Sequence, residues 1–131
     1  MQSIEELQTK LSQIHLYVAL PPPKLKEAIE LILEKIKSLG FFVSRRAEGY
    51  ALFPFQEAID AGLPDLRLTI MPQAIIISIH FATDLTEENA AKIGKSPQEI
   101  YDLLLNAVNH CVNVLSKYKK HALIFEVKTP Q

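Results

Sequence analysis

Ser96 to Lys120, SPQEIYDLLLNAVNHCVNVLSKYKK, is the stretch that decides the fold. Ser96 can cap the first backbone N–H groups of a helix, and Glu99, three residues on, can complete a capping box. Pro97 suits the first helical position, because its missing N–H would have no partner there anyway. The lysines near the far end suit the negative pole of the helix dipole. This stretch is therefore predicted to be one long helix.

The predicted helix has an apolar face and an unusual polar face. The apolar positions recur at helical spacing: Ile100, Leu103, Leu104, Ala107, Val108, Cys111, Val112 and Leu115. The polar face carries Asn106, Asn109, His110 and Asn113, in a segment without any formal charge. Solvated faces usually carry Lys and Glu, whereas neutral amides are typical of a surface that another chain, a helix or a ligand partly covers. We interpret these four residues as a candidate interface. A merely polar exposed face and a ligand site are the alternatives.

Length and composition predict one ordinary domain spanning residues 1–131, large enough to fold without disulfides or metal. The net charge of −1 argues against a dedicated nucleic-acid binder. A single cysteine, Cys111, excludes an internal disulfide and fits a reducing cytoplasm; its place on the apolar helix face indicates a buried structural thiol. We find no signal peptide and no apolar run long enough to span a bilayer, so no membrane partner is expected.

Two amphipathic helices are predicted before the first strand. Ser3 and Glu6 resemble a capping box. They open a helical stripe that ends by about Leu20: Ile4, Leu7, Leu11, Ile14 and Val18. Pro21-Pro22-Pro23 follows as a stiff connector. The second helix is predicted over Lys24 to Leu39, with Gly40 placed to end it.

After Gly40 the hydrophobic period changes from about 3.6 to 2, which predicts strands. The predicted strands are Phe41–Arg46, Tyr50–Phe55, Leu66–Met71, Ala74–Ala82 and, after the long helix, His121–Lys128. Ala47-Glu48-Gly49 is predicted to be a hairpin loop, and Pro72-Gln73 a turn. The connection from Ala82 to His121 is long enough to make the last strand parallel to Ala74–Ala82, if the two are neighbours.

The predicted order is therefore α-α-β-β-β-β-α-β, an α+β two-layer sandwich with a mostly antiparallel sheet of about five strands and the long C-terminal helix packed on it. One sheet face is expected to pack on that helix: Ile75, Ile77, Ile79, Phe81, Leu123, Phe125 and Val127. The other face is mixed: Arg67, Thr69, Ile76, Ser78, His80, Ile124 and Glu126. We expect the early helices or a partner to cover part of this mixed face.

Pro64-Asp65 together with Glu126-Val127-Lys128 resembles the PD…(D/E)xK pattern of restriction-endonuclease-like nucleases. The resemblance implies that Asp65 and Glu126 hold Mg²⁺ near a phosphate, and that Lys128 orients water or stabilises charge. The sequence departs from the family pattern, because strands and a long helix separate the two halves where the family has a short hairpin. The alternative is that Asp65 is a turn residue and that Glu126 and Lys128 are outward strand positions.

His80, Arg67 and Glu126 are expected on one face of the sheet, where they would form an acid–base cluster or ligand pocket if their strands are neighbours. A partly buried, hydrogen-bonded histidine is the structural alternative. No His or Cys spacing resembles a zinc site, and no phosphate loop, dinucleotide fingerprint or nucleophile elbow is present in the sequence, so no metal or cofactor is expected.

These patterns favour a non-enzymatic cytoplasmic protein that works by protein–protein contact with itself, as a homodimer, or with another protein. Adaptor, chaperone-like, antitoxin and immunity-type roles fit equally well, by analogy. The alternative function is a small enzyme or ligand binder with a pocket near His80, Arg67 and Glu126, the metal-dependent nuclease being its sharpest version.

Overall fold

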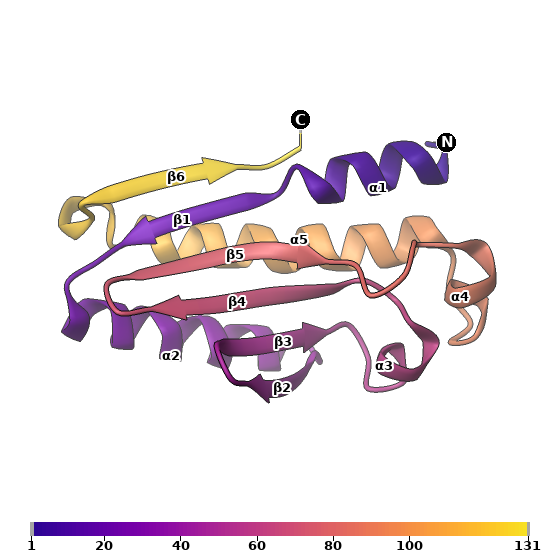
Figure 1. Ribbon diagram of the computed structural model, residues 1–131, viewed down its shortest axis with the longest axis horizontal. Helices are drawn as coiled ribbons and strands as arrows, with labels where there is room; N and C mark the ends of the chain where they lie inside the picture. The colour runs from indigo at the N-terminus through magenta and orange to yellow at the C-terminus, as the bar shows by residue number, and fades with distance from the viewer. Residues whose placement is uncertain (1, 131) are drawn as a thin grey trace.

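The long helix predicted from the sequence is α5 (Pro97–Ser116), and the rest of the fold is built against it (Figure 1). The structure is a computed structural model that describes residues 2–130. The predicted capping box is formed: the Glu99 amide donates to Ser96 Oγ, and the Ser96 amide donates to Glu99 Oε1, both at 3.2 Å. Two of the first unpaired donors of α5 are satisfied in this way.

An antiparallel sheet forms the second layer. The described residues contain six strands rather than about five: β1 (His15–Ala19), β2 (Phe42–Arg46), β3 (Gly49–Phe53), β4 (Asp65–Met71), β5 (Ala74–His80) and β6 (Ile124–Lys128). Their order across the sheet is β2-β3-β4-β5-β1-β6, and each neighbouring pair is antiparallel. The α+β class and the packing of the long helix on the sheet are thus confirmed.

The helices lie mainly on one side of the sheet. Two of them, α1 (Ile4–Ser12) and α2 (Pro22–Ser38), both contact α5. Figure 1 shows α5 running behind the sheet, with α1 along its upper side and α2 along its lower side. Three shorter elements complete the chain: α3 (Ala58–Ala61), α4 (Glu87–Ala91) and the 3-10 turn η1 (Lys119–His121).

The prediction that the first helix continues to about Leu20 is wrong. α1 ends at Ser12, and the following residues form β1, which lies between β5 and β6. Leu16 and Val18 alternate with half-buried residues and are fully buried, as a central strand requires. Pairing on both sides, which no local pattern can reveal, decides between helix and strand here. The observed order therefore has an extra strand between the first two helices.

The last strand has the predicted direction but a different neighbour. β6 pairs with β1, and β1 pairs with β5, so β6 runs parallel to β5 without touching it. The N-terminal strand β1 occupies the position between them.

The two faces of the sheet differ in burial. On the helix side, Ile75 and Ile77 are buried as predicted, and Phe125 and Val127 pack half-buried against the core. Leu123 does not join them: it precedes β6 and is 74% exposed. On the opposite side, the predicted mixed residues of β4 and β5 are neighbours across these two strands, for example Thr69 opposite Ile76, whereas Ile124 and Glu126 lie on β6, beyond β1.

The opposite face of the sheet is not covered by the early helices, since both pack beside α5. Its residues are largely half-exposed, including Tyr17, Ile76 and Thr69. We call it the open face of the sheet. Within residues 2–130, no helix combines the length and the apolar character that crossing a bilayer needs.

Candidate functional site

The four residues predicted as an interface lie on the outer surface of α5. Asn106, Asn109 and Asn113 are exposed, and His110 is half-buried. Neither α1 nor α2 covers the asparagines, although both pack against the flanks of the helix. The structure therefore excludes an internal helix as the cover of these asparagines and leaves them available to solvent or to another molecule.

Charges of opposite sign border this neutral stretch. Glu99 and Asp102 are exposed near the N-terminus of α5, and Lys117 and Lys120 are exposed just after its C-terminus. The signs are those that the helix dipole favours at each end. The outer surface of α5 thus changes from acidic through neutral to basic along its length. We call this surface the α5 face.

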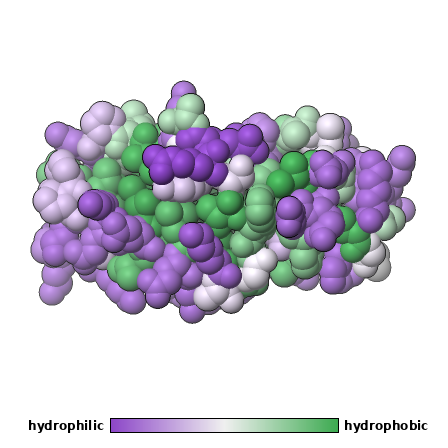
Figure 2. Space-filling model, turned by 90° about the horizontal axis from the view of Figure 1, so that it is seen from below, coloured by the Kyte–Doolittle hydropathy of each residue, from purple (hydrophilic) through white to green (hydrophobic). Residues whose placement is uncertain are grey.

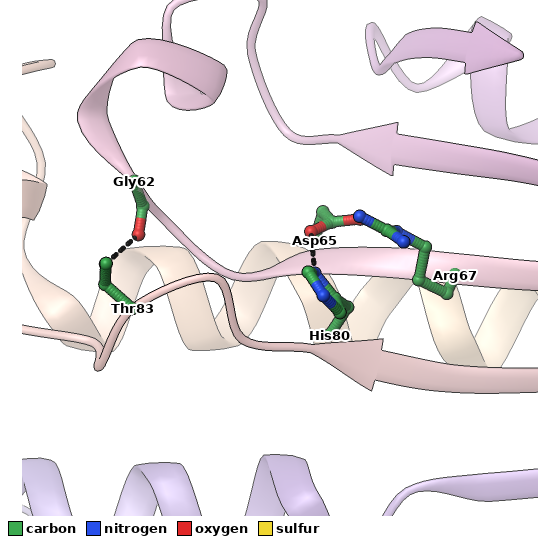
Figure 3. Close-up of polar contacts among 5 residues, drawn as sticks. All are labelled: Gly62, Asp65, Arg67, His80 and Thr83. Atoms are coloured by element: carbon green, nitrogen blue, oxygen red, sulfur yellow. Dashed lines mark hydrogen bonds and ion pairs between the residues drawn. The ribbon is translucent and has the colours of Figure 1, made fainter. Parts of the chain in front are cut away.

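A second polar constellation lies on the open face of the sheet, around Asp65 (Figure 3). Asp65 is the first residue of β4 and stands opposite His80, the last residue of β5. Its Oδ2 accepts a bond from Arg67 Nε at 2.6 Å, and its Oδ1 lies 3.1 Å from His80 Nδ1. Because Arg67 is two residues along the same strand, its side chain projects from the same face.

Asp65 is 1% exposed and is the buried charged residue of the described chain, whereas the side chains of Arg67 and His80 are 30% and 41% exposed. An unpaired buried carboxylate would be costly, so its two partners offset the loss of water. A further bond, from Thr83 Oγ1 to the Gly62 carbonyl at 2.6 Å, joins the segment before β4 to the segment after β5 (Figure 3). The carboxylate is therefore held on a braced pair of strands.

A hollow of about 400 Å³ opens beside this cluster. Its lining includes the cluster residues Arg67 and His80, the hydroxyls of Thr69 and Ser78, and Arg46 with Glu48 from the β2–β3 hairpin. The hollow therefore brings two guanidinium groups, an imidazole and two hydroxyls to one place.

Glu126 does not belong to this cluster. It lies on β6 opposite Tyr17 of β1, and β1 separates it from His80. Asp65, which the sequence pattern connected with the nuclease resemblance or with a turn, is the acid that contacts Arg67 and His80. The two-residue turn Pro72-Gln73 carried the missing signal: extending the hairpin from Met71 opposite Ala74 leads directly to Asp65 opposite His80.

The nuclease constellation is not assembled either. Asp65 is on β4, while Glu126 and Lys128 are on β6, with β5 and β1 between them. Across the described part of the chain, no group of three His, Cys, Asp or Glu side chains is arranged to hold a metal ion.

A third feature is an apolar hollow of about 480 Å³ between α2 and the β4–β5 turn. Ile29 and Leu33 of α2 line one side, and Tyr50, Ile70 and Met71 line the other. Its lining also includes Lys26 and Glu30 of α2. Figure 2, a view from below relative to Figure 1, shows a hydrophobic area bordered by hydrophilic residues.

Replacing Asp65 by alanine is expected to destabilise the fold by about 2 kcal/mol, because two charge-assisted bonds disappear from a buried position. The loss stays below that of a fully buried pair, since Arg67 and His80 can turn to water. Urea unfolding at fixed protein concentration measures it. The matched control is Asp84→Ala at an exposed aspartate, which should change stability by less than about 0.5 kcal/mol. Equal effects of the two substitutions would contradict a stabilising role of the cluster.

No protein-family model matches the sequence, and no curated protein matches it. The function of these surfaces is therefore inferred from their own chemistry.

Proposed function

We propose that this chain is a non-enzymatic protein–protein interaction module that works as a homodimer, with the α5 face as the interface. The observation that carries the proposal is the charge order along that face: acidic, neutral, basic. A helix face with this order is complementary to a second copy of itself running in the opposite direction.

The charge complementarity between the two α5 helices favours one register. In an antiparallel pair related by a two-fold axis, residues equally far from the axis face each other across the interface. With the axis midway between Asn109 and His110, Asp102 faces Lys117 of the second copy. Asn106 then faces Asn113, and the uncharged residues fill the centre. Each contact occurs twice because of the symmetry.

The ion pairs set orientation more than affinity. An exposed pair contributes about 0.2–1 kcal/mol, so the affinity must come from the covered central surface. That surface has apolar material at its flanks. Leu105 and Val112 are half-buried, and Leu31, 37% exposed, lines a hollow of about 310 Å³ between α2 and α5 together with Val114. Amide side chains between such apolar groups can be hydrated in the monomer and covered in the dimer.

Charge reversal tests the proposed pairing. Asp102→Lys is expected to weaken self-association about tenfold or more, because it replaces two attractive contacts by two repulsive ones. Lys117→Asp should weaken association similarly. The double variant Asp102→Lys/Lys117→Asp should regain most of it, since the pair is restored with opposite sign. Light scattering on a sizing column, over a wide concentration range, gives the dissociation constants.

The matched control is Asp84→Lys, which makes the same charge change at an exposed aspartate outside α5. It should leave association unchanged. A wild-type protein that stays monomeric at high concentration would overturn the homodimer. A stable dimer that tolerates both single reversals would place the interface elsewhere.

A further inference from the structure

We propose that the hollow beside Arg67 and His80 binds a small oxyanion, a carboxylate or phosphate group. The first observation concerns the atoms through which Asp65 contacts Arg67 and His80. Arg67 is held through Nε and His80 through Nδ1. Neither residue makes another side-chain hydrogen bond to the described protein. Both terminal nitrogens of Arg67 are therefore left to donate to a ligand.

The second observation is that the buried carboxylate fixes groups that would otherwise be mobile. Arginine side chains on an open sheet face lose considerable rotamer freedom when they bind a ligand. Here the bond to a 1% exposed aspartate has already restricted Arg67, and the same aspartate orients the imidazole of His80. Such prior orientation lowers the entropic cost of binding and is the usual support of a binding group.

The third observation concerns the rest of the hollow. Ser78 stands opposite Arg67 on the neighbouring strand, Thr69 follows on the same face, and Arg46 approaches from the hairpin. The lining also contains one exposed acid, Glu48. With Asp65 and Glu48 balancing the two arginines, net charge does not select the ligand. Donor geometry does: a guanidinium fork with nearby hydroxyls matches the oxygens of a carboxylate or phosphate.

The volume sets an upper limit on the ligand. A hollow of about 400 Å³ is at the lower end of the size range of small-molecule sites, and it is open to solvent on the sheet face. It accommodates an isolated phosphate, a small organic acid or one acidic group of a larger molecule. Because it lies on the opposite side of the sheet from the α5 face, oxyanion binding and self-association can be tested separately.

The test is a titration of the whole chain with sodium phosphate and, separately, sodium acetate, followed by two-dimensional NMR at constant ionic strength. Sodium chloride is the reference salt. The expected result is saturable shifts at Ser78, Thr69 and His80 with phosphate or acetate, and none that saturate with chloride. Saturation by phosphate alone would narrow the ligand class to phosphate groups, and saturation by acetate alone to carboxylates.

Three variants test whether the oxyanion binds in the hollow beside Arg67 and His80. Arg67→Met should weaken binding at least tenfold. Arg46→Met removes an exposed side chain, so it should keep the fold and weaken binding severalfold. The matched control is Arg45→Met, because Arg45 is the adjacent arginine, projects from the other side of β2 and lies 5.9 Å over the Tyr50 ring. It should leave binding unchanged. Shifts that never saturate, or saturable binding that survives both Arg67→Met and Arg46→Met, would overturn the proposal.

Discussion

Raising the pH from 9 to 11 is expected to lower the free energy of unfolding by roughly 2–3 kcal/mol through one side chain, Cys111. Its place on the apolar face of the helix predicted a buried structural thiol, and Cys111 is a buried free cysteine that is 1% exposed. Burial away from water disfavours the thiolate and raises the pKa of Cys111 from 9.0 to about 12.

The sign follows from proton binding. Between pH 9 and pH 12 the unfolded chain releases the thiol proton, whereas the folded chain keeps it. Stability is therefore complete below about pH 9, falls by about 1.4 kcal/mol per pH unit above it, and levels off beyond the folded pKa. Tyr118 acts in the same direction from about pH 10 upward. Burial raises its pKa to about 12, and its hydroxyl donates to Glu27 Oε1 at 2.8 Å.

Urea unfolding at pH 8, 9, 10 and 11, in the presence of a reductant, measures this dependence. The matched variant is Cys111→Ala, which should be about 1 kcal/mol less stable than the wild type at pH 8 because it loses buried volume. Its profile should fall less steeply, so the two profiles should converge and cross near pH 10. Tyr118→Phe should flatten the profile only above pH 10. Parallel profiles for wild type and Cys111→Ala would mean that the thiol ionises equally easily in both states.

Local chemistry explains why the start and the apolar face of α5 could be predicted, although the helix ends at Ser116, before the predicted end at Lys120. Its start depends on contacts between residues three apart, Ser96 and Glu99, and its apolar face on a periodicity within one helix. Neither depends on how distant segments meet. The same holds for the β4–β5 hairpin, where the Pro72-Gln73 turn fixes the register.

The strand β1 could not be predicted in this way. Leu11, Ile14 and Val18 fit a helical stripe, while Leu16 and Val18 fit the alternation of a strand, and the segment is too short for either pattern to dominate. Its state is decided by pairing with β5 and β6, segments far along the chain. Misassigning it also misplaced Glu126, because the inserted strand separates β6 from β5 and hence from His80.

The α5 face and the Asp65 cluster differ in the same way in how far the sequence predicts them. The residue types on the α5 face were visible in the sequence, because they lie on one helix. The Asp65 cluster combines residues from two strands, and its acid was identified only once the register was known. Sequence patterns thus indicated which side chains were unusual, and topology decided which of them meet.

The strongest single-residue effect on the fold is expected at Gly49, at the start of β3. Gly49→Ala should lower the free energy of unfolding by about 3 kcal/mol. Gly49 has φ +150°, a conformation that residues with a side chain rarely adopt, and a Cβ added there would lie 1.9 Å from the Leu68 carbonyl oxygen. That oxygen belongs to the backbone of β4 and cannot rotate away. The hairpin must shift, which also strains the bond from the Ile70 amide to the Glu48 carbonyl at 2.8 Å.

The matched control is Gly94→Ala. Gly94 also has a positive φ, +69°, but no atom lies within 4 Å of its added Cβ. Its substitution should cost only the backbone preference, about 1 kcal/mol. Urea unfolding of both variants distinguishes the steric clash of the added Cβ at position 49 from the cost of a positive φ alone. Equal losses would mean that the hairpin moves freely away from β4. Because Gly49 also lines the hollow beside His80, a shifted hairpin should weaken oxyanion binding there, whereas Gly94→Ala should leave it unchanged.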